Sequence, residues 1–185
     1  TALASFAVFI YKVTGLRRYF SNKQDDSNEK TLYADVAYFY EKGKRKKQED
    51  SWYISPLEEY KNVGVLACIA DGIGGLRDGA QASNEVTDRI ASMFPLAFDD
   101  SDANADRIKQ ISNDLYNKYK RAAGSTLAMM HIFEDKMHFY SVGDSEIILI
   151  RNGRATVLNP KQNYSRILIN RLVAQRQITN LIRRH

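Results

Sequence analysis

Residues 63–75 read VGVLACIADGIGG, and this stretch decides the fold class. The run Val63–Ala70 is apolar and has the length of a strand that is buried on both faces. It ends at Asp71, and three glycines follow within the next four residues. A carboxylate at the end of a buried strand is rigidly held, and glycine lets a ligand approach the main chain closely. The spacing alone leaves two interpretations open: Asp71 is a ligand for a hard cation, or it caps a plain turn.

Strand and helix patterns surround this stretch in the order strands, two helices, strands, one helix. Alternating apolar residues predict a half-buried strand over 32–40, and Asn152-Gly153 is a strong hairpin signal. The other predicted elements are a strand at 52–54, helices around 86–94 and 105–119, strands at 125–132, 136–142, 146–151 and 155–158, and a last helix at 164–174. Hairpins imply antiparallel pairing, so the order predicts an α+β fold in which two sheets pack together with helices outside.

Composition indicates a globular protein and restricts its partners. The 185 residues are 44% hydrophobic and 26% charged, which suits one globular domain. The formal net charge of +5 comes from the run Lys42–Lys47 and from the end of the chain at 176–183. Nucleic-acid binding is not supported, because the cations form no basic stripe with interleaved aromatics and no reader motif is present. A mildly basic surface would instead attract an anionic substrate.

The chain divides into an apolar segment at 1–20, a polar linker at 21–30 and a main domain at 31–185. The apolar run in the first segment is about half the length that a membrane span needs, so a docked helix or strand is the favoured interpretation. Membrane attachment through this segment stays open. Cys68 is the only cysteine and cannot form an internal disulfide, which predicts a reducing, cytoplasmic location.

Three further motifs are individually weak. Arg45 precedes the acidic pair Glu49-Asp50, where a charged surface loop is the alternative interpretation. The segments 123–126 (AGST) and 142–145 (VGDS) flank apolar strands, and each alone is typical of a turn. The glycines after Asp71 do not form a dinucleotide-binding fingerprint, since Arg77 stands where the last glycine is required.

Taken together and in order, these motifs resemble those of PP2C-type metal-dependent serine/threonine protein phosphatases, with bacterial members the most similar. The resemblance covers about residues 32–185. It implies a β-sandwich of antiparallel sheets flanked by helices in α-β-β-α layers, cut short at the C-terminal end, with a two-metal centre at one end. The implied activity is hydrolysis of phosphoserine and phosphothreonine in protein substrates.

The resemblance also implies which residues serve the metals, which would be Mn²⁺ or Mg²⁺. Asp71 would bridge two ions and Gly72 would offer its carbonyl oxygen to one of them. Glu49 and Asp50 would hold metal-bound waters, so that Glu49 belongs to the catalytic set. Asp144 matches the aspartate that helps to bind a third ion in some members.

Arg45 would grip the substrate phosphate, and a water activated between the cations would attack phosphorus without any protein nucleophile. Several positions depart from the family pattern. Glu146 replaces the usual arginine after Gly-Asp-Ser, and Ile73 follows Asp-Gly where eukaryotic members often have histidine. The family's later Asp-Gly motif and its final aspartate have no counterpart up to His185. A catalytically inactive relative that binds a phosphoprotein or a regulatory partner is therefore the alternative function.

Overall fold

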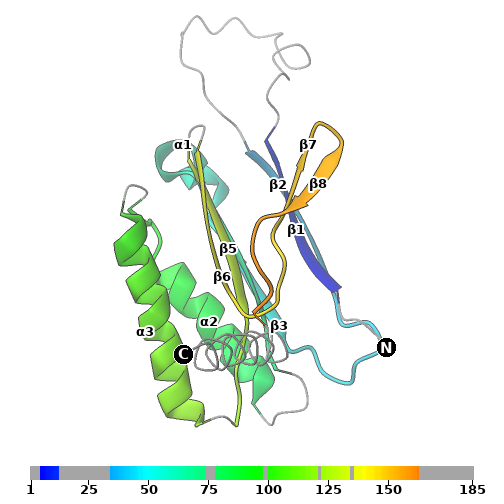
Figure 1. The fold of residues 1–185 in the computed structure, drawn as a ribbon, viewed down its shortest axis with the longest axis vertical. Helices are drawn as coiled ribbons and strands as arrows, with labels where there is room; N and C mark the ends of the chain where they lie inside the picture. Colours follow the sequence, from blue (N-terminus) through cyan, green and yellow to red (C-terminus); the bar gives the residue numbers. More distant parts are fainter. Residues whose placement is uncertain are drawn as a thin grey trace, which may run out of the picture.

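A computed structural model of the chain describes residues 5–12, 34–73, 78–97, 100–120, 122–133 and 136–162. A four-stranded antiparallel sheet in the order β3-β4-β5-β6 forms its centre. Two helices cover one face of this sheet, and the ribbons β1–β2 and β7–β8 lie on its other side (Figure 1). The strands are β1 (Ser5–Lys12), β2 (Ala34–Glu41), β3 (Asp50–Ile54), β4 (Val65–Asp71), β5 (Leu127–Phe133), β6 (Lys136–Val142), β7 (Ile148–Arg151) and β8 (Arg154–Val157). The helices are a 3₁₀ turn at Leu57–Glu59, α1 (Tyr60–Val63), α2 (Gly79–Ser92) and α3 (Ser101–Tyr119).

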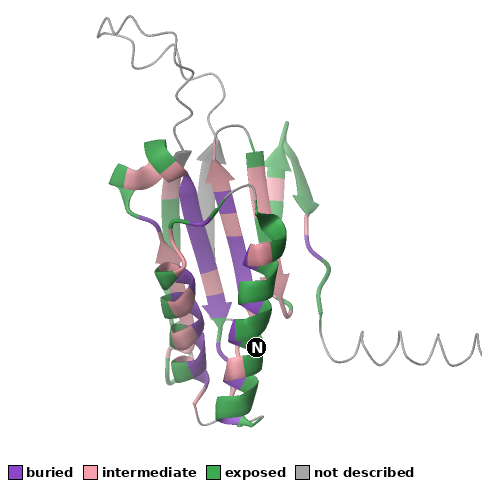
Figure 2. Cartoon of the chain, turned by 90° about the vertical axis from the view of Figure 1, so that its left-hand side faces the viewer, coloured by how far each residue is buried: buried purple, intermediate pink, exposed green. Residues whose placement is uncertain are grey.

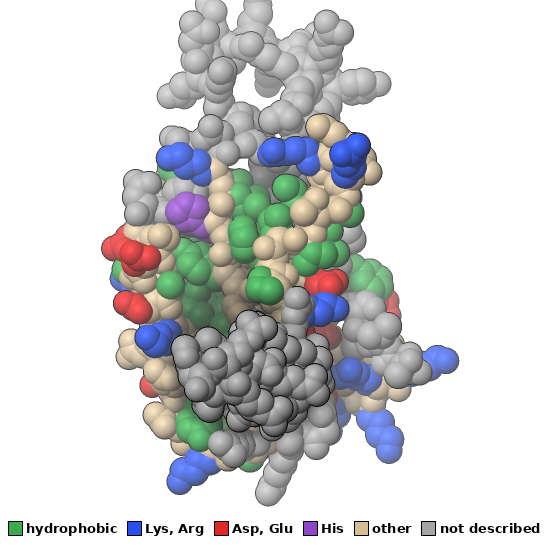
Figure 3. Space-filling model, in the orientation of Figure 1, with side chains coloured by type: hydrophobic (Ala, Val, Ile, Leu, Met, Phe, Trp, Pro, Cys, Tyr) green, Lys and Arg blue, Asp and Glu red, His purple; other side chains and the backbone are tan. Residues whose placement is uncertain are grey.

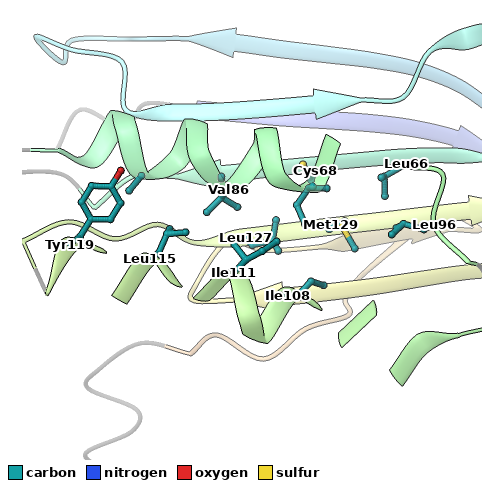
Figure 4. Packing of buried hydrophobic residues seen from close by; sticks show 13 residues of the cluster. Leu66, Cys68, Val86, Leu96, Ile108, Ile111, Leu115, Tyr119, Leu127 and Met129 are labelled. Atoms are coloured by element: carbon teal, nitrogen blue, oxygen red, sulfur yellow. The ribbon is translucent and has the colours of Figure 1, made fainter. Parts of the chain in front are cut away.

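The hydrophobic core lies between the helices and the central sheet. Strand β4 is buried along nearly its whole length, as the apolar run predicts, and purple marks it in Figure 2. Its even-numbered residues pack with the apolar stripes of α2 and α3 and with β5 (Figure 4). The cluster comprises Leu66, Cys68, Ala70, Ala82, Val86, Ile90, Leu96, Ile108, Ile111, Leu115, Tyr119, Leu127 and Met129. Each large aliphatic side chain buried in this way stabilises the fold by about 1.5–3 kcal/mol.

Because side chains alternate along a strand, this packing also decides which face holds Asp71. Leu66 and Ala70 point toward the helices, so Asp71 belongs to the opposite face of the sheet. The core packing thus places the end of β4 with its acidic side chain turned away from the helical layer.

Most of the predicted elements are confirmed, with shifted ends. The turn at Asn152-Gly153 has φ angles of 52° and 72°, as the predicted two-residue hairpin turn requires. The strand predicted to open at residue 125 begins at Leu127, and the one predicted from 146 begins at Ile148. The helix predicted at 164–174 lies outside the described residues.

One region differs from the sequence prediction. Residues 57–63 form the 3₁₀ turn and α1, which are too short to show a helical period. Val63 ends α1, and Gly64 then takes φ 81° before the strand starts. The apolar run therefore spans a helix end and a strand.

The apolar N-terminal segment contains β1, which pairs antiparallel with β2 from Ser5 opposite Glu41 to Lys12 opposite Ala34. This arrangement corresponds to the docked strand among the alternatives above. No helix in the described part of the chain is long and apolar enough to cross a bilayer. The division into segments 1–20, 21–30 and 31–185 stays a prediction.

Candidate metal centre

Two carboxylates face each other at one end of the central sheet. Asp50 begins β3, Asp71 ends β4, and the antiparallel register makes them direct partners. Side chains of directly opposed residues project from the same face with Cβ atoms about 4.5–5.5 Å apart. Twenty residues lie between these acids in the sequence, and the strand pairing brings them together.

The environment of Asp71 is that of an acid crowded by other acids. Asp71 is exposed as a whole residue, but neighbouring atoms partly bury its carboxyl group. This burial, the negative charge of Asp50, a hydrogen bond with Asp50 and the charge of Asp144 raise the pKa of Asp71 to about 6, and Arg45 opposes them. A cation between the carboxylates would relieve this repulsion, because opposite charge favours the ionised form.

The backbone of Asp71 is fixed by the segment at 124–126. The Asp71 N–H donates to Thr126 Oγ1 at 3.0 Å. The Asp71 carbonyl accepts from the Thr126 N–H at 2.9 Å and from Ser125 Oγ at 3.2 Å. Thr126 Oγ1 also shares a 2.6 Å hydrogen bond with Ser145 Oγ. The Gly-Ser-Thr motif thus connects the end of β4 to the turn that carries Asp144.

Gly72 occupies a place where no side chain fits. Its N–H donates to the Glu49 carbonyl at 3.0 Å. A Cβ at Gly72 would meet the carbonyl oxygen of Gly79 and lie 2.6 Å from that of Glu49. Ser83 Oγ of α2 donates to the same Glu49 carbonyl. Backbone atoms are therefore in direct contact where the start of β3, the end of β4 and the start of α2 meet.

Arg45 and Glu49 lie beside the acidic pair. Arg45 Nη1 is 3.8 Å from Glu49 Oε2, a long ion pair in which the Glu49 side chain is 16% exposed and that of Arg45 37%. Within the described residues this is the ion pair that Arg45 makes. The guanidinium group has five N–H donors, so this one contact leaves it able to bind an anion.

Asp144 lies in the turn between β6 and β7, and the side chain of Asn159 and the backbone of Gln162 hold that turn. Asn159 accepts from the Ile147 N–H at 2.7 Å and donates from Nδ2 to the Ser145 carbonyl at 2.8 Å. The Gln162 N–H donates to the Gly143 carbonyl at 2.8 Å. These contacts fix the turn at a distance from which the charge of Asp144 is felt at Asp71.

Glu146 and Asn159 show two limits of the sequence interpretation. Glu146 forms an ion pair with Lys161 at 3.0 Å, so a nearby cation balances its charge. Asn159 is 4% exposed and braces the turn, yet a single asparagine in a polar segment gives no signal of this role. Its partners are backbone groups of residues 145 and 147, which only the folded turn brings within reach.

The oxygen atoms at this end of the sheet are of the type that binds a hard divalent cation. They supply only some of the ligands that such a cation needs. Carboxylate and carbonyl oxygens are the groups that Mg²⁺ and Mn²⁺ prefer. Asp50 and Asp71 are opposed, and Asp144 is close enough to act on Asp71 electrostatically. Among the residues that the structure describes, no three His, Cys, Asp or Glu side chains are close enough together to hold one ion. Further ligands would have to come from water, substrate or other residues.

The sequence also matches a known protein family. The family model for Protein phosphatase 2C matches residues 43–176, which is well over half of the 185-residue chain. The chain belongs to the protein phosphatase 2C family.

Individual relatives support the same assignment. The chain is 26% identical over 133 residues to Probable protein phosphatase 2C 11 of Arabidopsis thaliana, covering 70% of this chain and 36% of that protein. It is similar to a bacterial serine phosphatase of solved structure, with 28% identity, a TM-score of 0.57, and coverage of 73% of this chain and 56% of that one. The catalytic domain of the phosphatase PstP, solved with two manganese ions, shares the fold at 18% identity and a TM-score of 0.55. The match covers 92% of this chain and 61% of that one. The chain spans only about a third of the curated relative's length.

Proposed function

We propose that this chain carries the first part of the active site of a metal-dependent protein phosphatase that hydrolyses phosphoserine and phosphothreonine in proteins. The opposed carboxylates of Asp50 and Asp71 carry this proposal, together with the Arg45–Glu49 ion pair beside them. Two acids at a sheet end suit cations, and an arginine next to them suits a phosphate group. Family membership supports the reaction class.

Each residue has a distinct role in this proposal. Between them, Asp50, Asp71, Asp144 and the Gly72 carbonyl would hold two or three Mn²⁺ or Mg²⁺ ions, as the two manganese ions in the PstP catalytic domain suggest. When bound, such cations neutralise developing charge and lower the pKa of a coordinated water. The chain's own contribution is to hold these oxygens at fixed positions through the β3–β4 register and the Thr126 contacts.

Arg45 would bind two oxygens of the substrate phosphate through its planar guanidinium group. Glu49 keeps that group at the edge of the site through the 3.8 Å ion pair. Glu49 would also hold a water on the side facing the acids. A buried free thiol at Cys68 suits a reducing compartment such as the cytosol.

The test is phosphate release from a phosphothreonine peptide with and without Mn²⁺. We expect release that depends on the metal and that Asp71→Asn abolishes while circular dichroism shows an unchanged fold. Activity retained in Asp71→Asn would contradict the role of Asp71. Binding of the peptide without release, in a folded protein supplied with Mn²⁺, would contradict the catalytic proposal and support a phosphoprotein-binding domain.

Arg45 is tested separately. We expect Arg45→Ala to raise the KM for the phosphopeptide while leaving Mn²⁺ affinity almost unchanged, and Arg45→Lys to recover only part of the loss, since lysine lacks the bidentate geometry. Equal losses of peptide use and of Mn²⁺ affinity would show that Arg45 supports the site in another way.

A further inference from the structure

The loop between β2 and β3 concentrates the positive charge of the chain. Five of the six residues in Lys42–Lys47 are lysine or arginine, so five of the 27 lysines and arginines of the chain stand within six positions. We call residues 42–47 the basic loop. All of its lysines are exposed. Figure 3 shows Lys and Arg side chains gathered at the lower right, where Figure 1 places the connection from β2 to β3.

The basic loop has a defined shape. The Arg45 N–H donates to the Lys42 carbonyl at 3.3 Å, which closes a β-turn. Gly43 takes φ 61° within this turn, a conformation that favours glycine. The chain then reaches Glu49 and Asp50 within a few residues. Lys42 and Lys44 therefore lie in the same turn as Arg45, and Lys46 and Lys47 stand between this turn and Glu49.

The lysines of the basic loop have no ionic partner among the described residues, whereas two other lysines of the chain are paired. Lys118 lies 2.6 Å from Glu85 and Lys161 lies 3.0 Å from Glu146. Among the described residues, the basic loop forms one ion pair, between Arg45 and Glu49. Four positive charges at the rim are thus available to a ligand.

The positive charges of the basic loop would offset the repulsion between the acidic site and a phosphopeptide. The site holds the carboxylates of Glu49, Asp50, Asp71 and Asp144, which repel an anionic phosphopeptide as it approaches. The five cations of the basic loop offset this field on the side where Arg45 would receive the phosphate. An extended peptide advances about 3.3–3.6 Å per residue, so residues close to the phosphorylated one pass within reach of lysine side chains.

We propose that the basic loop selects substrates that carry Asp or Glu next to the phosphorylated residue, an inference that rests on the phosphatase function proposed above. Lys44, Lys46 and Lys47 flank Arg45 and are the cations that would pair with these acids. An acidic peptide fits better than an anionic membrane, because residues 42–47 include no apolar side chain that could insert into a bilayer.

The experiment compares two labelled phosphothreonine peptides of equal length, one with Glu and one with Gln on both sides of the phosphothreonine. Binding is measured by fluorescence anisotropy and turnover by phosphate release with Mn²⁺. We expect the Glu peptide to bind about 10-fold more tightly at low salt, as two exposed ion pairs would give. Raising the salt concentration should reduce this preference, because salt screens exposed charges.

Matched variants locate the effect. Lys46→Gln/Lys47→Gln should lower the preference for the Glu peptide to about 3-fold or less. Lys109→Gln/Lys136→Gln removes the same charge from exposed positions on α3 and β6 and should leave the preference intact. An unchanged preference in the variant of the basic loop would overturn the inference.

The two proposals fail in different ways. Turnover of both peptides at equal efficiency would overturn the role of the basic loop and leave the phosphatase function standing. Charge-dependent binding without turnover would overturn the phosphatase function and support the loop as a binding element. Phosphatidylcholine–phosphatidylserine vesicles are the third arm: binding that Lys46→Gln/Lys47→Gln abolishes, without any peptide preference, would assign the loop to membranes and overturn the inference.

Discussion

Asp71→Asn should stabilise the metal-free protein at neutral pH while it destroys the proposed metal centre. In the folded state, partial burial of the carboxyl group and the neighbouring Asp50 raise the pKa of Asp71 from 3.8 to about 6. The folded protein therefore binds a proton more tightly than the unfolded chain, and its stability falls as the pH rises from about 4 to about 6. Above about pH 6, the ionised Asp71 lowers the free energy of unfolding by its full amount. Asparagine keeps the shape of the side chain and removes the charge.

The expected gain in the free energy of unfolding follows from the shift in the pKa of Asp71. A rise from 3.8 to about 6 corresponds to about 3 kcal/mol at full strength. Asp71 is exposed, so solvent screening reduces this to about 1 kcal/mol. For a chain of 185 residues such a gain raises Tm by about 2–4 °C. The gain should be present at neutral pH and vanish below pH 4, where Asp71 is protonated in both states.

The assay is thermal unfolding of the wild type and Asp71→Asn in EDTA over the pH range 4–8, followed by the same measurement with Mn²⁺. Mn²⁺ at about 100 times its Kd should stabilise the wild type by about 2.7 kcal/mol and leave the variant unchanged. Asp106→Asn, which removes an exposed acid from α3, is the control for general charge effects. A gain that persists at pH 4, or equal stabilisation of both proteins by Mn²⁺, would refute the reasoning.

Three further outcomes are expected. Gly72→Ala should lower the free energy of unfolding by about 1–3 kcal/mol, because its Cβ would meet backbone that cannot move aside, and urea denaturation would measure this. Gly153→Ala is its control: open space surrounds that position, so only the strain of its positive φ, about 1–2 kcal/mol, should be seen, and an equal or smaller cost for Gly72→Ala would contradict the packing argument. Asn159→Ala should cost about 1–3 kcal/mol, because one buried and one partly buried hydrogen bond to the turn are lost, and a neutral result would show that water replaces them. Burial raises the pKa of Cys68 to about 12, so a thiol reagent should modify it only on unfolding, and fast labelling of the native protein would contradict the buried placement.

The sequence predicts the elements better than it predicts their contacts. The apolar run before Asp71 and the spacing in α2 and α3 are local patterns, and they identify the core strand and both long helices. The pairing of Asp50 with Asp71 is not local, because it depends on which residues of two strands are opposed. A resemblance to a family could suggest that both acids serve one centre, but only the register shows them side by side.

The sequence also could not predict the side-chain hydrogen bonds that connect different elements around the site. Thr126 and Ser145 look like turn residues, and each becomes a link in the site only because β4, β5 and the turn after β6 meet there. The 3₁₀ turn and α1 were missed because a single helical turn carries no periodic signal. Both gaps have the same cause: contacts made across elements leave no pattern in one stretch of chain.

The pairing of Asp50 with Asp71 makes correct alignment of β3 and β4 a condition for the cation site proposed above. A slip of one residue between these strands would place Asp50 opposite Ala70 and would turn every side chain of the shifted strand to the opposite face. The centre and the core would be lost in the same event. Cation affinity can therefore serve as a direct readout of whether a refolded or redesigned copy of this sheet has paired its strands correctly.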